Sequence, residues 1–212
     1  MTISHDLLRL KLAESLAAAS PDLTRRDVRL PGIRGKALAV IGVRRGGKTS
    51  FLQQCRSDRL AEGRSPESQL LVSLEDERLA GMSVADLGWL LDEHARQFPG
   101  LAEAGGFTLY LDEVQTVPGW EGLVRRLVDA GNVELFVSGS SARLLSREVA
   151  TSLRGRAMEV LVLPFSFREA LRHAESEPTE PWERLRPTER AALDQRLRRY
   201  LAPDLLICDD FG

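Results

Sequence analysis

Cysteine, lysine and long apolar runs are all scarce in this chain of 212 residues. The two cysteines, Cys55 and Cys208, lie far apart in the sequence, so they indicate neither a disulfide framework nor a zinc site. No apolar run approaches the roughly 18 residues that a membrane-spanning helix needs. The first residues carry charges throughout and lack the apolar stretch of a signal peptide. We therefore expect a reduced, cytoplasmic setting without membrane contact.

The chain also has no large excess of positive or negative charge. The formal net charge is −2, so the chain does not have the overall basic character typical of nucleic-acid binding. Arginine-rich stretches, at Arg125 and Arg126 and at residues 196–199, leave a local basic patch as a weak nucleic-acid alternative. Lysine occurs only at Lys11, Lys36 and Lys48 among the 29 basic residues. A lysine at position 48 therefore stands out where arginine is the common choice.

Short apolar runs alternate with segments of helical periodicity. The strands are expected at residues 37–43, 69–74, 106–114, 133–139 and 157–164. The helices are expected at residues 4–19, 49–60, 84–98, 120–130, 142–150, 166–173 and 189–201. This alternation predicts an α/β fold in which a parallel sheet is covered by helices on both faces. Ligands of such sheets bind at the carboxyl ends of the strands.

A glycine-rich loop with the sequence GVRRGGKTS follows the first expected strand and opens a helix. It matches the pattern G-x-x-x-x-G-K-[ST] in full, so its backbone N–H groups and the helix dipole are expected to hold phosphates. Lys48 would reach the β- and γ-phosphates, and the Thr49 hydroxyl would bind Mg²⁺. Phosphate binding by this loop does not require Arg44 and Arg45. Their side chains are expected to point outward, toward a partner. The predicted nucleotide-binding residues are Gly42, Val43, Arg44, Arg45, Gly46, Gly47, Lys48, Thr49 and Ser50.

Two adjacent carboxylates end the third expected strand. Asp112 is placed to hold Mg²⁺, and Glu113 to polarise a water molecule in line with the γ-phosphate. Neighbouring side chains on a strand diverge, so we expect separate roles for the two. The guanine-reading N-K-x-D stretch is absent, because the chain's one asparagine, Asn132, is followed by Val133. The kinase H-R-D loop is absent too.

Further polar residues follow later strands. Ser138 or Ser140 is a candidate sensor of the γ-phosphate, while Ser140 or Ser141 can instead cap the next helix. Arg154 and Arg156, before the fifth strand, can stabilise transition-state charge in cis or in trans, or form a solvated surface pair. The acidic residues Glu75, Asp76 and Glu77 can approach Mg²⁺, although a solvated loop is the preferred interpretation. His94, on the apolar side of a helix, is expected to be a packing residue.

Three stretches, GVRRGGKTSFL, TLYLDEVQ and LFVSGSSARLLSREVATSLRGRAMEVLVLPFSFREAL, resemble a family of prokaryotic AAA-type ATP-binding proteins. These are P-loop ATPases of the division with an added catalytic strand. The resemblance implies a three-layer P-loop NTPase fold with the strand order 5-1-4-3-2, and ATP with Mg²⁺ at the nucleotide site. It also makes Ser138 the polar sensor and Arg154 or Arg156 a conditional arginine. Members are usually fused to a C-terminal domain, which this chain does not include.

These expectations define three parts: an N-terminal helix and connector (residues 1–30), the ATPase core (31–175), and a helical extension (176–212) leading toward the absent domain. The expected function is Mg²⁺-dependent ATP hydrolysis, weak in isolation, that drives a conformational switch. The catalytic residues would be Lys48, Glu113, Ser138, Arg154 and Arg156, with Thr49 and Asp112 at the metal. The alternative is a nucleotide-gated interaction module with little turnover, acting with a homo-oligomer or a protein partner.

Overall fold

The computed structural model describes residues 3–33, 35–103, 107–139, 153–180 and 184–200. The chain forms two compact units. The larger comprises Met1–Leu23 and Val28–Pro164, and the smaller comprises Thr24–Asp27 and Phe165–Gly212. The three expected parts, divided after residues 30 and 175, stay a prediction. The first helix nevertheless belongs to the same compact unit as the sheet.

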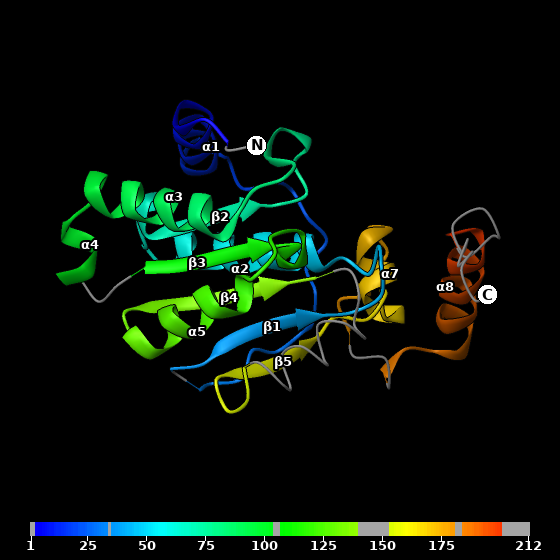
Figure 1. Ribbon diagram of the computed structural model, residues 1–212. Helices are drawn as coiled ribbons and strands as arrows, with labels where there is room; N and C mark the ends of the chain where they lie inside the picture. Colours follow the sequence, from blue (N-terminus) through cyan, green and yellow to red (C-terminus); the bar gives the residue numbers. More distant parts are fainter. Residues whose placement is uncertain (1–2, 34, 104–106, 140–152, 181–183, 201–212) are drawn as a thin grey trace, which may run out of the picture. The chain divides into compact units, whose positions relative to one another are not determined.

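Five parallel strands form one sheet in the larger unit (Figure 1). Their order is β2-β3-β4-β1-β5, which confirms the expected order when read from the other edge. All five strands were expected, and each ends one to three residues earlier than its apolar run. The strands are β1 (Ala37–Ile41), β2 (Gln69–Ser73), β3 (Phe107–Asp112), β4 (Val133–Ser138) and β5 (Ala157–Leu161).

Helices connect the strands, as the alternating pattern predicted. The expected helix at residues 142–150 lies outside the described residues. In the part of the chain that the structure describes, no helix is both long and apolar enough to cross a membrane. The α-helices of the larger unit are α1 (His5–Ala17), α2 (Lys48–Ala61), α3 (Val84–Gln97), α4 (Gly100–Glu103) and α5 (Trp120–Ala130). Short 3₁₀ turns are η1 (Pro66–Ser68), η2 (Glu77–Leu79) and η3 (Val114–Thr116).

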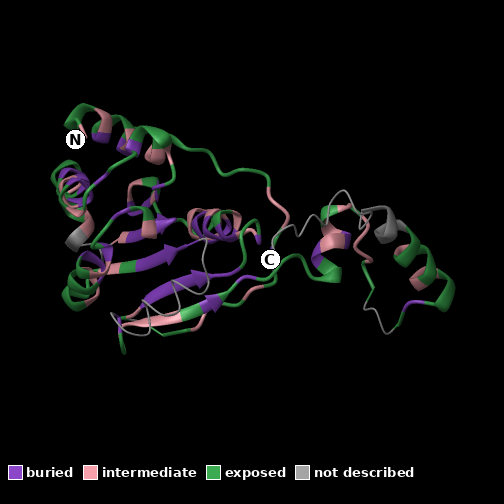
Figure 2. Ribbon diagram, turned by 45° about the vertical axis from the view of Figure 1, so that its right-hand side comes forward, coloured by how far each residue is buried: buried purple, intermediate pink, exposed green. Residues whose placement is uncertain are grey.

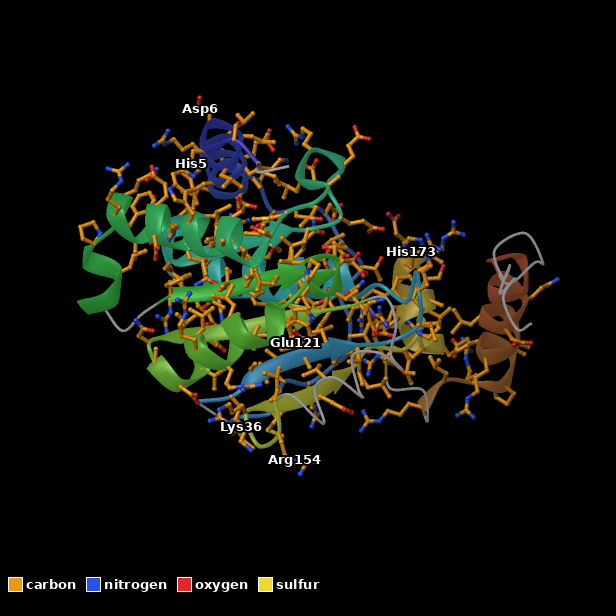
Figure 3. All side chains as sticks on the ribbon, in the orientation of Figure 1. His5, Asp6, Lys36, Glu121, Arg154 and His173 are labelled. Atoms are coloured by element: carbon orange, nitrogen blue, oxygen red, sulfur yellow. The ribbon has the colours of Figure 1, made fainter. Side chains whose placement is uncertain are left out.

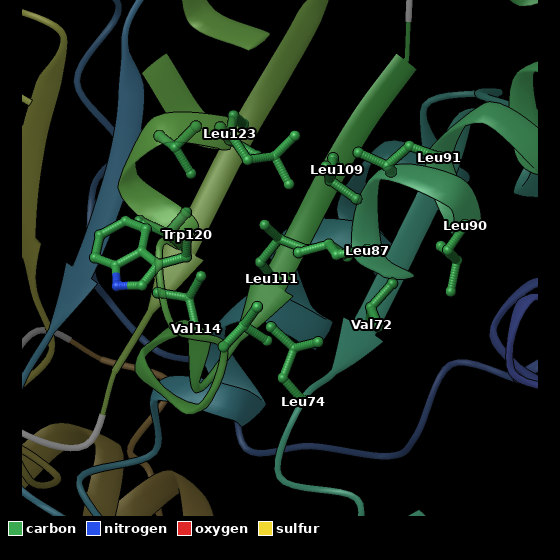
Figure 4. Close-up of a cluster of buried hydrophobic side chains, with 14 of the residues drawn as sticks. Val72, Leu74, Leu87, Leu90, Leu91, Leu109, Leu111, Val114, Trp120 and Leu123 are labelled. Atoms are coloured by element: carbon green, nitrogen blue, oxygen red, sulfur yellow. The ribbon is translucent and has the colours of Figure 1, made fainter. Parts of the chain in front are cut away.

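Alternate side chains of the strands enter two separate cores, because successive residues of a strand point to opposite faces. On β3, Leu109 and Leu111 belong to a core that includes residues of α3 and α5 (Figure 4) and of α1, whereas Tyr110 packs with Phe51 and Leu52 of α2 on the other face. Buried residues accordingly lie along the strands and the inward sides of the helices (Figure 2). The three layers hold the ends of β1, β3 and β4 in place beside α2.

A buried arginine ties α1 to the rest of the larger unit. Arg56 of α2 is 4% exposed, and its guanidinium donates to three carbonyl oxygens. These belong to Gln69 of β2 (3.1 Å), Ala18 (3.0 Å) and Ser15 (3.3 Å). Helix α1 has no basic residue in its last turn, so a cation from α2 satisfies the carbonyl groups at its C-terminus.

The smaller unit is built around α7 (Phe167–His173) and α8 (Pro187–Tyr200). Ser166 and Glu169 form the expected capping box at the start of α7. The Glu169 carboxylate also accepts from the Asp27 N–H at 2.8 Å and from Arg26 Nε at 3.0 Å. Residues 24–27 are thereby held to α7, although they are distant from it in the sequence.

Candidate nucleotide site

The loop between β1 and α2 has a backbone that requires glycine at two positions. A Cβ atom on Gly42 would lie 2.1 Å from the carbonyl oxygen of Val162, just after β5. Gly47, the N-cap of α2, has φ 89°, in the left-handed region that glycine adopts without steric cost. The Gly46 N–H donates to the Val43 carbonyl at 3.0 Å and closes the turn. The loop therefore curls tightly between the end of β1 and the first turn of α2.

Lys48 begins α2, and its side chain turns back over the loop. It is 4% exposed. Its Nζ donates to the carbonyl oxygens of Val43 at 3.1 Å and Gly42 at 3.4 Å. The same Nζ lies 4.0 Å from Oε1 of Glu113. The ammonium group is thus surrounded by oxygen acceptors at the carboxyl end of β1.

Asp112 ends β3 beside α2. The Thr49 hydroxyl donates to its Oδ2 at 2.8 Å, and the Ser138 hydroxyl donates to its Oδ1. Asp112 is 2% exposed, and this burial raises the pKa of its carboxyl group, while the hydrogen bonds from Ser138 and Thr49 act in the opposite direction. Residues that are distant in the sequence therefore form one hydrogen-bonded chain, Thr49–Asp112–Ser138.

The Glu113 carboxylate has different described partners from the Asp112 carboxylate. The backbone of Glu113 is left-handed, with φ 57° and ψ 49°, and begins η3. Ser138 Oγ accepts its N–H at 3.1 Å. The Gln115 amide Nε2 donates to its Oε2 at 2.6 Å. The structure thus places Glu113 between Lys48 and Gln115, and Gln115 is a residue that sequence reasoning did not select.

Ser138 lies at the end of β4 and is fully buried. Both of its described hydrogen bonds go to the Asp112–Glu113 pair. Its predicted contact with a γ-phosphate stays a prediction, and Ser140 and Ser141 lie outside the described residues.

The described donor set fits Mg²⁺. The hydroxyl of Thr49 and the carboxylate of Asp112 are adjacent oxygen groups of the kind that Mg²⁺ takes as ligands, and Mg²⁺ in nucleotide sites commonly takes one or two protein ligands together with phosphate oxygens and water. Within the described ranges, no group of three or more His, Cys, Asp or Glu side chains gathers as a metal site.

The arginines predicted from the sequence lie in two different places. Arg44 and Arg45 are exposed on the phosphate loop. Arg154 and Arg156 instead precede β5, and Figure 3 labels Arg154 and Lys36 near the starts of their strands. The Arg156 side chain pairs with Asp129 at 2.7 Å. The backbone carbonyl of Arg156 accepts the N–H of Ala37, the first residue of β1.

This placement separates the arginine pair before β5 from the phosphate loop of the same chain. The amino ends of parallel strands lie together on one side of a sheet and their carboxyl ends on the opposite side, and a strand of five residues spans about 16 Å. The structure therefore does not bring Arg154 or Arg156 to the chain's own loop. Of the roles expected for them, action in cis is not supported and action in trans stays a prediction, while the exposed Arg156–Asp129 ion pair agrees with the solvated surface alternative for Arg156.

In the acidic loop after β2, Glu75 and Glu77 are exposed, in line with the preferred interpretation of a solvated loop, whereas Asp76 is not simply solvated. Its carboxylate accepts from the Arg78 N–H at 2.9 Å and forms ion pairs with Arg78 and with Lys11 of α1. Hydrogen bonds from Arg78 and Lys11 lower the pKa of Asp76 well below its usual range. The loop is thus tied to α1.

His94 is buried and packs against Phe98 and Phe107, as expected of a packing residue. Its Nε2 also lies 2.8 Å from the Glu67 carbonyl oxygen. Cys55 is a buried thiol within the α2 core.

Comparison with known proteins agrees with this geometry. A family model described as an AAA domain matches residues 34–171. The chain belongs to this AAA domain family. Together with the parallel sheet and the loop that joins β1 to α2, the match identifies an α/β AAA-type P-loop NTPase. The resemblance inferred from the sequence is confirmed at this level.

Two relatives of this AAA domain chain are uncharacterized proteins. One, from Methanocaldococcus jannaschii, is 33% identical over 189 residues, which cover 87% of this chain and 40% of the relative. The other, from Haemophilus influenzae, is 36% identical over 138 residues, covering 65% and 33%. The chain thus spans well under half the length of both. A solved structure of C. elegans PCH-2 is a distant likeness, with a TM-score of 0.43 and 18% identity over 67% of this chain and 38% of that one.

Proposed function

We propose that this chain binds ATP with Mg²⁺ and hydrolyses it to ADP and phosphate, and that the cycle serves as a conformational switch. One observation carries the proposal: Thr49 and Asp112 meet at 2.8 Å beside Lys48, with the Glu113 carboxylate 4.0 Å from the lysine. In this proposal the phosphate-binding loop, the two metal ligands and the general base lie together at the carboxyl ends of the strands.

Each group has a chemical task. Backbone N–H groups of the loop and the start of α2 would bind phosphate oxygens, and Lys48 would exchange its loop carbonyl partners for those oxygens. Thr49 and Asp112 would hold Mg²⁺, which when bound neutralises charge on the phosphates. Glu113 would accept a proton from the attacking water molecule. Glu113 can do this without leaving the metal ligands incomplete, because its carboxylate contacts Lys48 and Gln115 and is not one of the two proposed ligands.

The test measures ATP binding and phosphate release separately. Removing the Lys48 ammonium by Lys48→Ala should weaken ATP binding by about 10- to 100-fold, the value of a charge-assisted hydrogen bond. Glu113→Gln should retain binding and lower phosphate release by about 100-fold or more. Lys36→Ala, at the start of β1, is the matched lysine control and should behave as wild type. Retained binding in Lys48→Ala, or unchanged release in Glu113→Gln, would contradict the proposal.

A second candidate function is a nucleotide-gated interaction module with little turnover of its own. The observation in its favour is that Arg154 and Arg156 lie at the amino ends of the strands, whereas the chain's own loop lies at their carboxyl ends. Arginines near a γ-phosphate can accelerate transfer by about 10³–10⁵-fold when another molecule supplies them. A single chain would then bind ATP and hydrolyse it slowly.

Protein concentration separates the two candidates. If turnover per chain rises with concentration, and light scattering shows ATP-dependent assembly, the chain is a self-assembling ATPase. Arg154→Ala and Arg156→Ala, tested one at a time, should then lower the assembled rate without weakening ATP binding by the separate chain. Slow turnover at every concentration, with a monomer in the presence and absence of ATP, would favour the interaction module.

A further inference from the structure

The carboxylate of Glu113 is contacted differently at its two oxygens. Oε1 faces the Lys48 ammonium at 4.0 Å. Oε2 accepts from the Gln115 amide at 2.6 Å. An ionised carboxylate only accepts hydrogen bonds, so the amide must present its NH₂ group. One oxygen is thereby held in place, while the other faces the phosphate-loop lysine.

The backbone around this contact is fixed independently. The Glu113 N–H donates to Ser138 Oγ at 3.1 Å, and the Glu113 carbonyl accepts from the Thr116 N–H at 3.2 Å. These bonds hold a non-glycine residue in the left-handed region, which is found chiefly where the surrounding structure imposes it and often at functional sites. Gln115 follows two residues later within η3. The turn therefore places the base and its amide partner next to each other.

A neutral amide suits this place better than a cation would. A lysine or arginine beside Oε2 would compete with Lys48 and partly neutralise the negative charge that a general base needs. A neutral donor restricts rotation of the carboxylate and leaves its charge intact. Orientation of this kind matters because small displacements of a catalytic group lower rates strongly.

We propose that Gln115 is a positioning residue for the base: it binds Oε2 of Glu113 and keeps Oε1 directed toward the phosphate side of the loop. The inference rests on the proposed function, because it assigns Glu113 as the base. Gln115 itself does not touch the nucleotide or the water molecule in this role.

The experiment compares Gln115→Met with a matched control. Methionine has a similar length and no donor. On α3, Gln97 donates to Glu93 Oε1 at 2.9 Å, which is the same kind of bond away from the loop. Gln115→Met should lower kcat for ATP by about tenfold and change KM less than twofold. Gln97→Met should leave both constants unchanged. Melting temperatures of the two variants report any general loss of stability.

A second variant and a double variant test the contact itself. Gln115→Glu keeps the side-chain shape but replaces the donor with a repelling carboxylate, and kcat should fall at least as far as in Gln115→Met. In single-turnover measurements on a Glu113→Gln background, adding Gln115→Met should change the residual rate less than twofold, because the base is already absent. An unchanged or raised kcat in Gln115→Met, or an equal tenfold loss on the Glu113→Gln background, overturns the inference.

The two proposals can fail separately. If Glu113→Gln hydrolyses ATP at the wild-type rate, the proposed function fails and this inference fails with it. If Glu113→Gln is inactive while both Gln115 variants match wild type, only the role of Gln115 is wrong.

Discussion

The hydroxyl group of Ser15 completes the hydrogen bonding of Leu71. Ser15 Oγ accepts the Leu71 N–H at 3.1 Å and donates to the Leu71 carbonyl at 2.6 Å. Leu71 belongs to β2, an edge strand of the sheet. The Ser15 side chain thus makes the two backbone hydrogen bonds to Leu71 that a neighbouring strand would otherwise make. An uncovered edge is a template for pairing with another chain.

Replacing this hydroxyl should therefore destabilise the larger unit. Ser15→Ala removes partners from one backbone donor and one acceptor, and we expect the free energy of unfolding to fall by about 1–2 kcal/mol. Urea denaturation checks the loss. The exposed Ser20 provides the control, since Ser20→Ala should change the free energy by less than about 0.5 kcal/mol. Equal stability of the two variants would mean that the Ser15 bonds contribute nothing.

Metal dependence should follow the Thr49 hydroxyl. Removing divalent metal with a chelator should reduce phosphate release to background if Thr49 and Asp112 hold Mg²⁺. Thr49→Ala should weaken the apparent Mg²⁺ affinity by at least about tenfold, whereas Thr49→Ser keeps the ligand oxygen and should stay close to wild type. A Mg²⁺ titration of phosphate release measures both. If alanine and serine variants have the same midpoint, Thr49 is not a ligand.

Ser138 should matter for both stability and turnover. Ser138→Ala leaves the buried N–H of Glu113 without its acceptor and removes a donor to Asp112, so the free energy of unfolding should fall by about 1–3 kcal/mol. Phosphate release should fall too, because both acidic residues lose a fixed contact. Chemical denaturation and steady-state kinetics test these effects. Ser73→Ala, at the exposed end of β2, is the control. A Ser138→Ala chain with wild-type kinetics would remove Ser138 from the catalytic set.

Acid should weaken the smaller unit through Glu169. Burial opposes ionisation of this side chain, but hydrogen bonds from the Ser166 and Asp27 N–H groups and from Arg26 outweigh it and lower its pKa to about 2. Because the folded pKa lies below the unfolded value of 4.5, the stabilisation is complete above about pH 4.5 and is lost as the pH falls toward 2. The contribution is on the order of 2–3 kcal/mol.

Carboxyl NMR titration of the whole chain measures this pKa directly. Glu169→Gln should flatten the dependence of stability on pH between about 4.5 and 2, where the wild type loses stability. A Glu169 that titrates at an ordinary value would contradict the expectation.

The main features of the fold could be predicted because they depend on local signals. Apolar runs bounded by turn residues marked all five strands, and the capping box at Ser166 marked the start of α7. The glycine-rich loop placed Lys48 and Thr49 together, and the end of β3 placed Asp112 and Glu113 nearby. These signals lie within a few residues of the features that they predict.

Long-range side-chain contacts left no comparable signal. Nothing near Arg56 in the sequence indicates that its acceptors lie on α1 and β2. The contact of Gln115 with Glu113 depends on the left-handed turn between them, which apolar periodicity does not report. The position of Arg154 and Arg156 could have been predicted, because residues that precede a parallel strand lie at the edge opposite the phosphate loop.

The contacts of the buried Arg56 guanidinium indicate that the folded unit begins before the first residue of the family match. The AAA match begins at residue 34, yet two of the three carbonyl acceptors of Arg56 lie before residue 20. A shortened chain that starts at the match would keep a buried cation while losing most of its partners, and would leave one side of β2 open. We therefore expect such a truncation to aggregate on expression, and the smallest autonomous piece of this protein to begin at α1.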